Sequence, residues 1–155
     1  SRNVIKKEYD MQDICSEYKI CPKTIDLNLD KKYFIMELYD SPLFKLIEQN
    51  NGILSEKHQK QIIHIYETLD KIKIFHNDPN ISNYMIKDNN VYIIDFGMSK
   101  NINRSLIQSH NTEHLNIVYM LMGFIINLKK SNCPKQSYQF LSKFLSDENK
   151  KLLNL

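Results

Sequence analysis

The spacing of apolar side chains in the first part of the chain changes from a helical to a strand-like period. Residues 5–19 have a loose helical pattern, which Pro22 ends. Two strand-like runs follow at 24–27 and 33–36, joined by residues 28–32. The pattern therefore predicts a helix followed by a pair of short strands.

The next part of the chain is predicted to be mainly helical. Ser41–Pro42 opens a short helix to about Gln49, and Asn51–Gly52 breaks it. Ser55 is a candidate N-cap of a long helix that runs to about Ile72. Four apolar side chains fall on one face of this helix: Ile62, Ile63, Tyr66 and Leu69. We expect that face to be buried.

The second half of the chain predicts a hairpin and then another long helix. Residues 84–86 and 91–94 have strand character, and the Asp and Asn residues at 88–90 favour a tight turn between them. The stretch 99–113 is polar, whereas 114–128 is nearly continuously apolar and predicts a central helix. Two short amphipathic segments follow, at 136–145 and 147–153.

Composition narrows the class of protein. A chain of 155 residues, 42% hydrophobic and 25% charged, suits one globular unit with a buried core, and a net charge of +3 is too small to indicate nucleic-acid binding. The longest apolar run, 117–128, is interrupted by Gly123 and Asn127, so no membrane span is predicted. Three cysteines without C-x-x-C spacing indicate neither a disulfide framework nor a zinc site.

Cysteine usage and composition also suggest where such a chain is found. Unpaired cysteines favour a reducing, intracellular location, so we expect a cytoplasmic protein. The chain has no alanine and no tryptophan, while Asn, Ile and Lys abound. This bias is typical of AT-rich coding sequences, as in large DNA viruses, some parasites and low-GC bacteria. For a viral chain the expected location is the host cytoplasm.

Two polar motifs carry the candidate chemistry. Residues 76–83, His-Asn-Asp-Pro-Asn-Ile-Ser-Asn, form H-x-D-x-x-x-x-N, and Asp95-Phe96-Gly97 follows the strand at 91–94. Single Asp and Asn residues are more often turn formers than ligands, but turns alone do not explain this spacing. The motif, the hairpin and the D-F-G together resemble the catalytic loop and the metal-binding loop of the protein-kinase superfamily.

The resemblance implies a fold and a set of roles. The fold class would be α+β, a protein-kinase-like fold with a reduced β N-lobe remnant at 1–38 and a mainly helical C-lobe at 39–155. Asp95 would place its carboxylate on Mg²⁺ or Mn²⁺, and Asn83 would offer its amide oxygen to a second ion. Asp78 would accept the hydrogen bond of the substrate hydroxyl as the general base.

The segment Tyr33 to Asp40 resembles the fifth strand and the hinge of a kinase. On that match Met36 is the gatekeeper at the back of the ATP pocket. The backbone of Glu37 and Tyr39 would hydrogen-bond the adenine edge, and Met85 would form the floor under the adenine. Without its position before the catalytic loop, the same segment fits an ordinary buried strand that ends in a turn equally well.

The chain departs from most kinases at its N-terminal side. Only thirty-six residues precede Glu37, and none forms the glycine-rich loop that covers the phosphates. The N-lobe is therefore expected to be truncated, cut or supplied elsewhere. Glu8 matches the helix glutamate that normally pairs with a strand lysine; alternatively, residues 4–6 end that lysine strand.

Other departures point to the atypical kinases. Asn77 replaces the arginine usual before the catalytic Asp, and no A-P-E motif follows the D-F-G. Asn116 stands where the central helix often has an Asp. The short segment after the D-F-G is similar to the RIO family, the kinase of the KEOPS tRNA-modification complex, and the aminoglycoside and choline phosphotransferases. Residues 81–83 and 93–97 resemble the KEOPS-type kinase most.

These observations leave three functions open. The leading interpretation is an ATP- and Mg²⁺-dependent phosphotransferase of the Ser/Thr protein-kinase type, with a protein substrate. The second is a truncated kinase-fold binding or decoy module, a pseudokinase that docks on a kinase-like partner. The third is a small-molecule kinase. Strands 24–27 and 33–36 would lack sheet neighbours, so self-association or a partner that covers them is expected.

Overall fold

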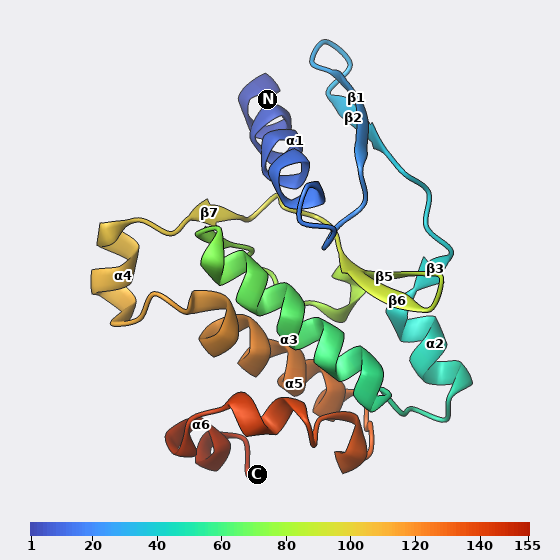
Figure 1. Cartoon of the computed structure of the whole chain (residues 1–155), viewed down its shortest axis with the longest axis vertical. Helices are drawn as coiled ribbons and strands as arrows, with labels where there is room; N and C mark the ends of the chain where they lie inside the picture. The colour runs from blue at the N-terminus through green and yellow to red at the C-terminus, as the bar shows by residue number, and fades with distance from the viewer.

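The computed structural model describes all 155 residues, and its elements fall into an N-terminal and a larger C-terminal group (Figure 1). The N-terminal segment, residues 1–38, holds α1 (Arg2–Ser16), β1 (Thr24–Asn28) and β2 (Tyr33–Met36). The apolar pattern predicts these three elements, and the structure confirms them. The alternative that residues 4–6 end a strand is wrong, because they lie inside α1.

The β1–β2 hairpin rests on α1 but has no further strand beside it. Phe34 packs edge-to-face on Tyr9 of α1, with ring centroids 5.7 Å apart. Thr24 Oγ1 donates a hydrogen bond of 2.5 Å to Asp13 Oδ1. Ile25 of β1, in contrast, is 60% exposed. Because the sheet has only two strands, both of its outer edges lack a partner strand.

The C-terminal group holds the remaining elements. It begins with β3 (Ser41–Pro42), α2 (Leu43–Gln49), α3 (Glu56–Lys71) and β4 (Ile74–Phe75). It continues with the 3₁₀ turn η1 (Ile81–Asn83), β5 (Tyr84–Lys87), β6 (Asn90–Ile93), β7 (Lys100–Asn101) and α4 (Arg104–His110). It ends with the π-helical η2 (Asn116–Met120), α5 (Leu121–Lys130), the 3₁₀ turns η3 (Lys135–Ser137) and η4 (Leu141–Phe144), and α6 (Asp147–Leu152). The mixture of helices and small antiparallel sheets is an α+β structure.

Helix α3 is the buried centre of this group, between the β5–β6 hairpin and α5 (Figure 1). Ser55 is its N-cap, as predicted, and Ser55 Oγ accepts a hydrogen bond from the N–H of His58. The four side chains of the predicted buried face are at most 3% exposed, which confirms that prediction. The face packs into one hydrophobic core of 31 residues.

The β5–β6 hairpin also forms as the sequence predicts. Asp88 and Asn89 both have left-handed φ angles, 50° and 61°, which is the two-residue turn that Asp and Asn favour. β3 pairs with β5 and completes a three-stranded sheet, so Ser41–Pro42 forms a short strand before α2. The residues that flank the open end of this hairpin, Asn83 before β5 and Asp95 after β6, are candidate site residues.

Two predictions differ from the structure, and one stretch without a predicted element contains two. The polar stretch 99–113 holds β7 and α4, and β7 pairs with β4. The apolar stretch 114–128 begins with the π-helical turn η2 before it becomes an α-helix. The segment 136–145 forms the two 3₁₀ turns η3 and η4 in place of a regular amphipathic helix.

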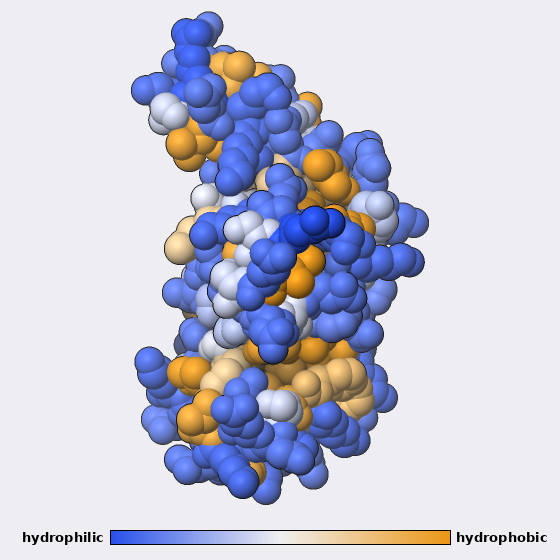
Figure 2. Space-filling model, turned by 90° about the vertical axis from the view of Figure 1, so that its left-hand side faces the viewer, coloured by the Kyte–Doolittle hydropathy of each residue, from blue (hydrophilic) through white to orange (hydrophobic).

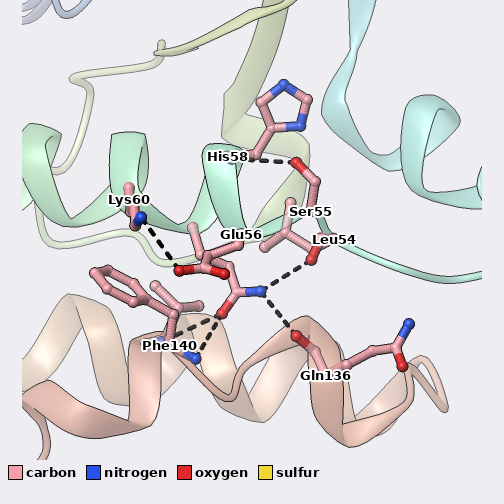
Figure 3. Close-up of polar contacts among 9 residues, drawn as sticks. Leu54, Ser55, Glu56, His58, Lys60, Gln136 and Phe140 are labelled. Carbon is pink, nitrogen blue, oxygen red and sulfur yellow. Dashed lines mark hydrogen bonds and ion pairs between the residues drawn. The ribbon is translucent and has the colours of Figure 1, made fainter.

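A buried glutamine on α3 holds these C-terminal turns in place. Gln59 Nε2 donates to the carbonyls of Leu54 (2.9 Å) and Gln136 (2.8 Å). Gln59 Oε1 accepts from the N–H groups of Phe140 (3.0 Å) and Leu141 (3.3 Å). Figure 3 shows these bonds crossing from the start of α3 to the C-terminal turns. The segment after α5 is therefore part of the same core.

The backbone uses few glycines where left-handed φ angles occur. Eleven residues other than glycine have positive φ, whereas Gly52 is the one glycine that does. Six of the eleven are asparagines, two are aspartates and three are lysines. Asn and Asp tolerate this conformation better than other side chains because they hydrogen-bond locally. Two of the eleven, Asn77 and Asp95, lie in the candidate site.

The surface is mostly polar. Figure 2 shows a largely hydrophilic face with separate apolar groups, some of them at the upper end where the N-terminal segment lies. The three cysteines are free and buried. None of the helices combines the length and the apolar character that a membrane crossing requires.

Candidate active site

The β5–β6 hairpin brings Asn83 and Asp95 to neighbouring strand ends. Tyr84 pairs with Ile93 at the open end of the hairpin. One residue further, the N–H of Ile94 donates to the carbonyl of Asn83 at 2.8 Å. The hairpin pattern in the sequence predicts this placement, and the structure confirms it.

His76, the first residue of the candidate catalytic loop (76–83), holds the loop by its buried side chain. The imidazole is fully buried, and its Nε2 donates to the carbonyl of Ile94 (2.8 Å). Its Nδ1 accepts from the N–H of Asp78 (3.3 Å), and the ring lies edge-to-face on Phe96. Burial lowers the pKa of His76, although the contact with Ile94 and the carboxylates nearby oppose the shift. A neutral, fully bonded imidazole holds the loop and has no free position for proton transfer.

Asp78 lies at the exposed side of this loop. Its Oδ1 accepts a hydrogen bond from the N–H of Asn80 (3.3 Å), and its carbonyl accepts from Asn83 Nδ2 (3.2 Å). The side chain is half-buried, so a substrate hydroxyl could reach it. The sequence places these two residues five positions apart, and the structure joins them by a direct contact.

Asn77 joins the catalytic loop to the D-F-G loop. Its φ angle is 70°, and its Nδ2 donates to the carbonyl of Met98 at 3.2 Å. Sequence reasoning identifies Asn77 only as a departure from the usual arginine. Its left-handed conformation and its amide contact are two roles that an asparagine can fill together.

The D-F-G loop presents an exposed carboxylate and buries its aromatic ring. Phe96 is 1% exposed, whereas Asp95 is exposed, and Asp95 Oδ1 accepts from the N–H of Gly97 (3.2 Å). A Cβ on Gly97 would lie 3.2 Å from Asp95 Oδ1 and 3.7 Å from Glu8 Oε2. The two carboxylates therefore lie on the same side of this loop.

Glu8 connects α1 to this carboxylate. Burial and, second, the charge of Asp95 raise the pKa of Glu8. None of the ion pairs in the structure includes Glu8, Asp78 or Asp95. The alternative in which Glu8 is the helix glutamate therefore fits its position on α1, but this chain places no lysine against it.

The donor set suits a hard cation. Asn83 Nδ2 is used by the carbonyl of Asp78, which leaves the amide oxygen for a ligand, and Asp95 adds a carboxylate. Oxygen ligands of this kind are those that Mg²⁺ prefers, with phosphate oxygens and water completing the shell. The chain has no group of three or more His, Cys, Asp or Glu side chains that could hold a metal alone. A cation here would need oxygen ligands in addition to those of Asn83 and Asp95.

Of the backbone groups predicted to contact adenine, some already have hydrogen-bond partners in the chain and others do not. The N–H of Glu37 donates to the carbonyl of Lys23 (2.9 Å), but the carbonyl of Glu37 and the N–H of Tyr39 have no backbone partner. Those two groups are free to bind an adenine edge. Lys87 pairs with the Glu37 carboxylate at 3.3 Å, and bonds from Lys23 and Lys87 lower the pKa of Glu37.

The two methionines do not enclose a pocket with these groups. A cavity of about 500 Å³ lies beside the hinge, lined by Glu37 and Tyr39 among others, but neither Met36 nor Met85 lines it. Met36 is 36% exposed, and its sulfur accepts from Gln12 Nε2. Met85 is half-buried. The adenine roles of the four residues stay predictions.

A polar network on the central helix supports the loop, and most of it was not predicted. Asn116 is fully buried, and its Oδ1 accepts from the N–H of His76 (3.1 Å). Its Nδ2 donates to Asp70 Oδ1 and to the carbonyl of Ile74, both at 2.8 Å. Burial raises the pKa of Asp70, and the bonds from Asn116 and Ile117 oppose the shift. Only the position of Asn116 was noticeable in the sequence.

Comparisons with known proteins place the chain in a family. A protein from Clostridium pasteurianum, described as "Uncharacterized protein in hydrogenase 1 5'region", is 29% identical over 121 residues. The aligned region is 76% of this chain and 23% of that protein, so the chain spans less than a quarter of its relative's length. The family model RIO1, for the RIO domain, matches residues 1–114, which include α1, the candidate hinge, the candidate catalytic loop and the D-F-G sequence. The chain therefore belongs to the RIO domain family, an atypical protein-kinase-like family of ATP-binding phosphotransferases.

Proposed function

We propose that this chain is an ATP- and Mg²⁺-dependent phosphotransferase that acts on Ser or Thr hydroxyls of a protein substrate in the cytoplasm. The observation that carries the proposal is the convergence of Asp78, Asn83 and Asp95, joined by the contact between Asn83 Nδ2 and the carbonyl of Asp78. On this proposal the N-terminal segment and residues 39–155 are the two lobes of a kinase-like fold.

Each of the three residues has a separate task. Mg²⁺, when bound, would neutralise charge on the nucleotide phosphates. Asp95 and Asn83 would hold the cation from the ends of β5 and β6, where the hairpin fixes their spacing. Asp78 would orient the acceptor hydroxyl and take its proton while the oxygen bonds to the γ-phosphoryl group, whose bond to the bridging oxygen of ATP breaks to release ADP. The carbonyl of Glu37 and the N–H of Tyr39 would bind the adenine edge.

A thermal-shift titration with ATP, with and without Mg²⁺, tests nucleotide binding. Ligand at 100 times its Kd stabilises the folded state by about 2.7 kcal/mol, which raises the melting temperature. Asp95→Asn should remove the Mg²⁺-dependent part of the shift, because it keeps the shape but removes the charge. Asp147→Asn, exposed in the first turn of α6, is the matched control and should keep the full shift. Equal shifts for wild type and Asp95→Asn would exclude the metal role.

The acceptor class needs a second measurement. Transfer of labelled phosphate from ATP to a mixture of folded proteins, compared with transfer to free amino alcohols and aminoglycosides, separates a protein kinase from a small-molecule kinase. Acid stability of the product then identifies phosphoserine or phosphothreonine. Label found only on small molecules would contradict the protein substrate and leave the phosphotransferase intact.

The surface of the N-terminal segment favours a second candidate, a binding or decoy module. The β1–β2 sheet has two strands and therefore two free edges. The edge strand β2, Tyr33-Phe34-Ile35-Met36, carries no charge that would discourage pairing with another strand. A kinase-like partner or a second copy of the chain could add a strand there. Equilibrium sedimentation of wild type and of Ile35→Lys tests this: a dimer that the lysine dissociates supports the module.

A further inference from the structure

We infer that Pro79 and Gly123 form a positioning pair that fixes Asp78 over the central helix. The inference rests on the proposed function and extends it to a contact between the candidate catalytic loop and α5. Pro79 directly follows Asp78 in the chain, so any displacement of its ring moves the Asp78 backbone.

The distances at Gly123 leave no room for a side chain. A Cβ on Gly123 would lie 2.4 Å from Cγ and 2.7 Å from Cβ of Pro79, far closer than such atoms can approach. The obstacle is a five-membered ring tied to the backbone, so it cannot rotate away as a flexible side chain could. The close approach of the loop to α5 therefore depends on a glycine at this position.

Two polar contacts hold the loop on either side of this point. Before it, the N–H of His76 donates to Asn116 Oδ1 (3.1 Å). After it, the N–H of Ile81 donates to Asn127 Oδ1 (3.5 Å). Pro79 lies between these two hydrogen bonds. The segment that carries Asp78 is therefore bonded at both ends, and between them Pro79 packs against Gly123.

Gly123 has no advantage for the helix itself. Glycine is less favourable than alanine in a helix interior because it loses more backbone entropy on folding. Asn127 Nδ2 donates to the carbonyl of Gly123 at 2.9 Å, a contact that any residue at 123 could accept. The seat for Pro79 is the feature that only a glycine supplies, which is why we assign Gly123 a positioning role.

A double-mutant cycle tests the pair. Gly123→Ala should lower kcat about 10²-fold, the effect of a small misplacement of a catalytic group. The KM for Mg²⁺–ATP should stay within twofold, because Asn83 and Asp95 are held by the β5–β6 hairpin. Pro79→Gly removes the whole obstacle, so the Gly123→Ala change in that background should cost less than threefold. Lys130→Ala, exposed at the end of α5, is the control and should leave kcat unchanged.

Hydrogen exchange of the backbone amides in residues 76–83 separates this inference from the proposed function. Gly123→Ala should speed exchange there, and the Pro79→Gly background should cancel the difference. A wild-type chain that neither binds Mg²⁺–ATP nor transfers phosphate would overturn the proposed function, while the exchange data would still test the pair. Equal effects of Gly123→Ala in both backgrounds, or no effect in either, would overturn the pair. If Gly123→Ala does not fold, folding of the double variant supports it and failure of both overturns it.

Discussion

Two buried glutamines show how the two parts of the molecule differ. Gln59 on α3 and Gln12 on α1 are each 1% exposed. Both acceptor bonds and both donor bonds of Gln59 are made, within the C-terminal group. Gln12 Nε2 donates to the carbonyl of Pro22 and to the Met36 sulfur, but Gln12 Oε1 has no partner. A buried acceptor without a partner costs stability, so the N-terminal segment is the less complete of the two.

The distribution of apolar surface gives the same contrast. Eight of the thirteen exposed large hydrophobic side chains belong to the N-terminal segment, which supplies only four of the 31 core residues. Leu38, at the hinge, is 93% exposed. The C-terminal group therefore encloses its own core and carries the candidate chemistry. The N-terminal segment presents surface that a nucleotide or another polypeptide could cover.

The largest expected effect is on chemistry in the C-terminal group. Asp78→Ala should lower turnover by about 10²–10⁴-fold, the range for a lost general base. The melting temperature and Mg²⁺–ATP affinity should change little, because the Asp78 side chain makes a single contact, with the N–H of Asn80. Steady-state kinetics and calorimetry measure the two. Unchanged turnover would exclude Asp78 as the general base.

Core substitutions should separate the stability of the two parts. Leu69→Ala on α3 removes a fully buried side chain and should cost about 2–5 kcal/mol in the free energy of unfolding. Ile35→Ala on β2, 44% exposed, should stay within about 0.5 kcal/mol. Urea unfolding followed by circular dichroism measures both. Similar costs would mean that the N-terminal segment is as well packed as the core.

The glutamines themselves provide a sharper comparison. Gln59→Leu leaves two buried carbonyls and two buried N–H groups without hydrogen-bond partners. It should therefore lower the free energy of unfolding by about 1–3 kcal/mol or more. Gln12→Leu removes the orphaned oxygen together with one bond to a carbonyl, and its net cost should be below about 1 kcal/mol. Chemical unfolding of both variants gives the difference. A larger loss for Gln12→Leu would show that its oxygen has a partner in solution.

The pH dependence of the free energy of unfolding should reveal the lowered pKa of His76. Its pKa is lowered in the folded state from 6.5, so the unfolded chain binds more protons when the solution is acidified. The stability contribution is fully present above pH 6.5 and is lost as pH falls toward the lower folded pKa, by up to about 1.4 kcal/mol per pH unit. His76→Phe should remove this slope, whereas His64→Gln, at an exposed position, should keep it. Identical pH profiles for all three proteins would contradict the neutral imidazole.

The contrast also explains what the sequence could and could not predict. Helix α3 and the β5–β6 hairpin have strong local signals: one apolar face, a serine cap and a tight turn. Helix α4 lacks such a signal, because none of its side chains is fully buried and its cap, Asn103, stands in a polar run. The kinase spacing predicted that Asp78, Asn83 and Asp95 converge. The structure joins Asp78 to Asn83, and Asn83 to Ile94, the residue before Asp95.

Tertiary contacts account for what was missed. The contact of Pro79 with Gly123 joins residues 44 positions apart, and no local sequence pattern predicts it. The bond between Asn116 and His76 is equally remote in sequence. The expected gatekeeper, Met36, is partly exposed because its strand has a single neighbour in the sheet. The role of Met36 as gatekeeper stays a prediction.

The eleven left-handed residues link the composition of the chain to its backbone. The chain has only three glycines, whereas Asn and Lys abound, so Asn or Lys occupies most of the positions where geometry favours Gly. Lysine in this conformation costs about 1–2 kcal/mol. Lys19, Lys32 and Lys73 are all exposed with φ near 60°. Glycine at these three exposed positions would remove this cost, so the three lysines hold a reserve of stability that lies outside the core.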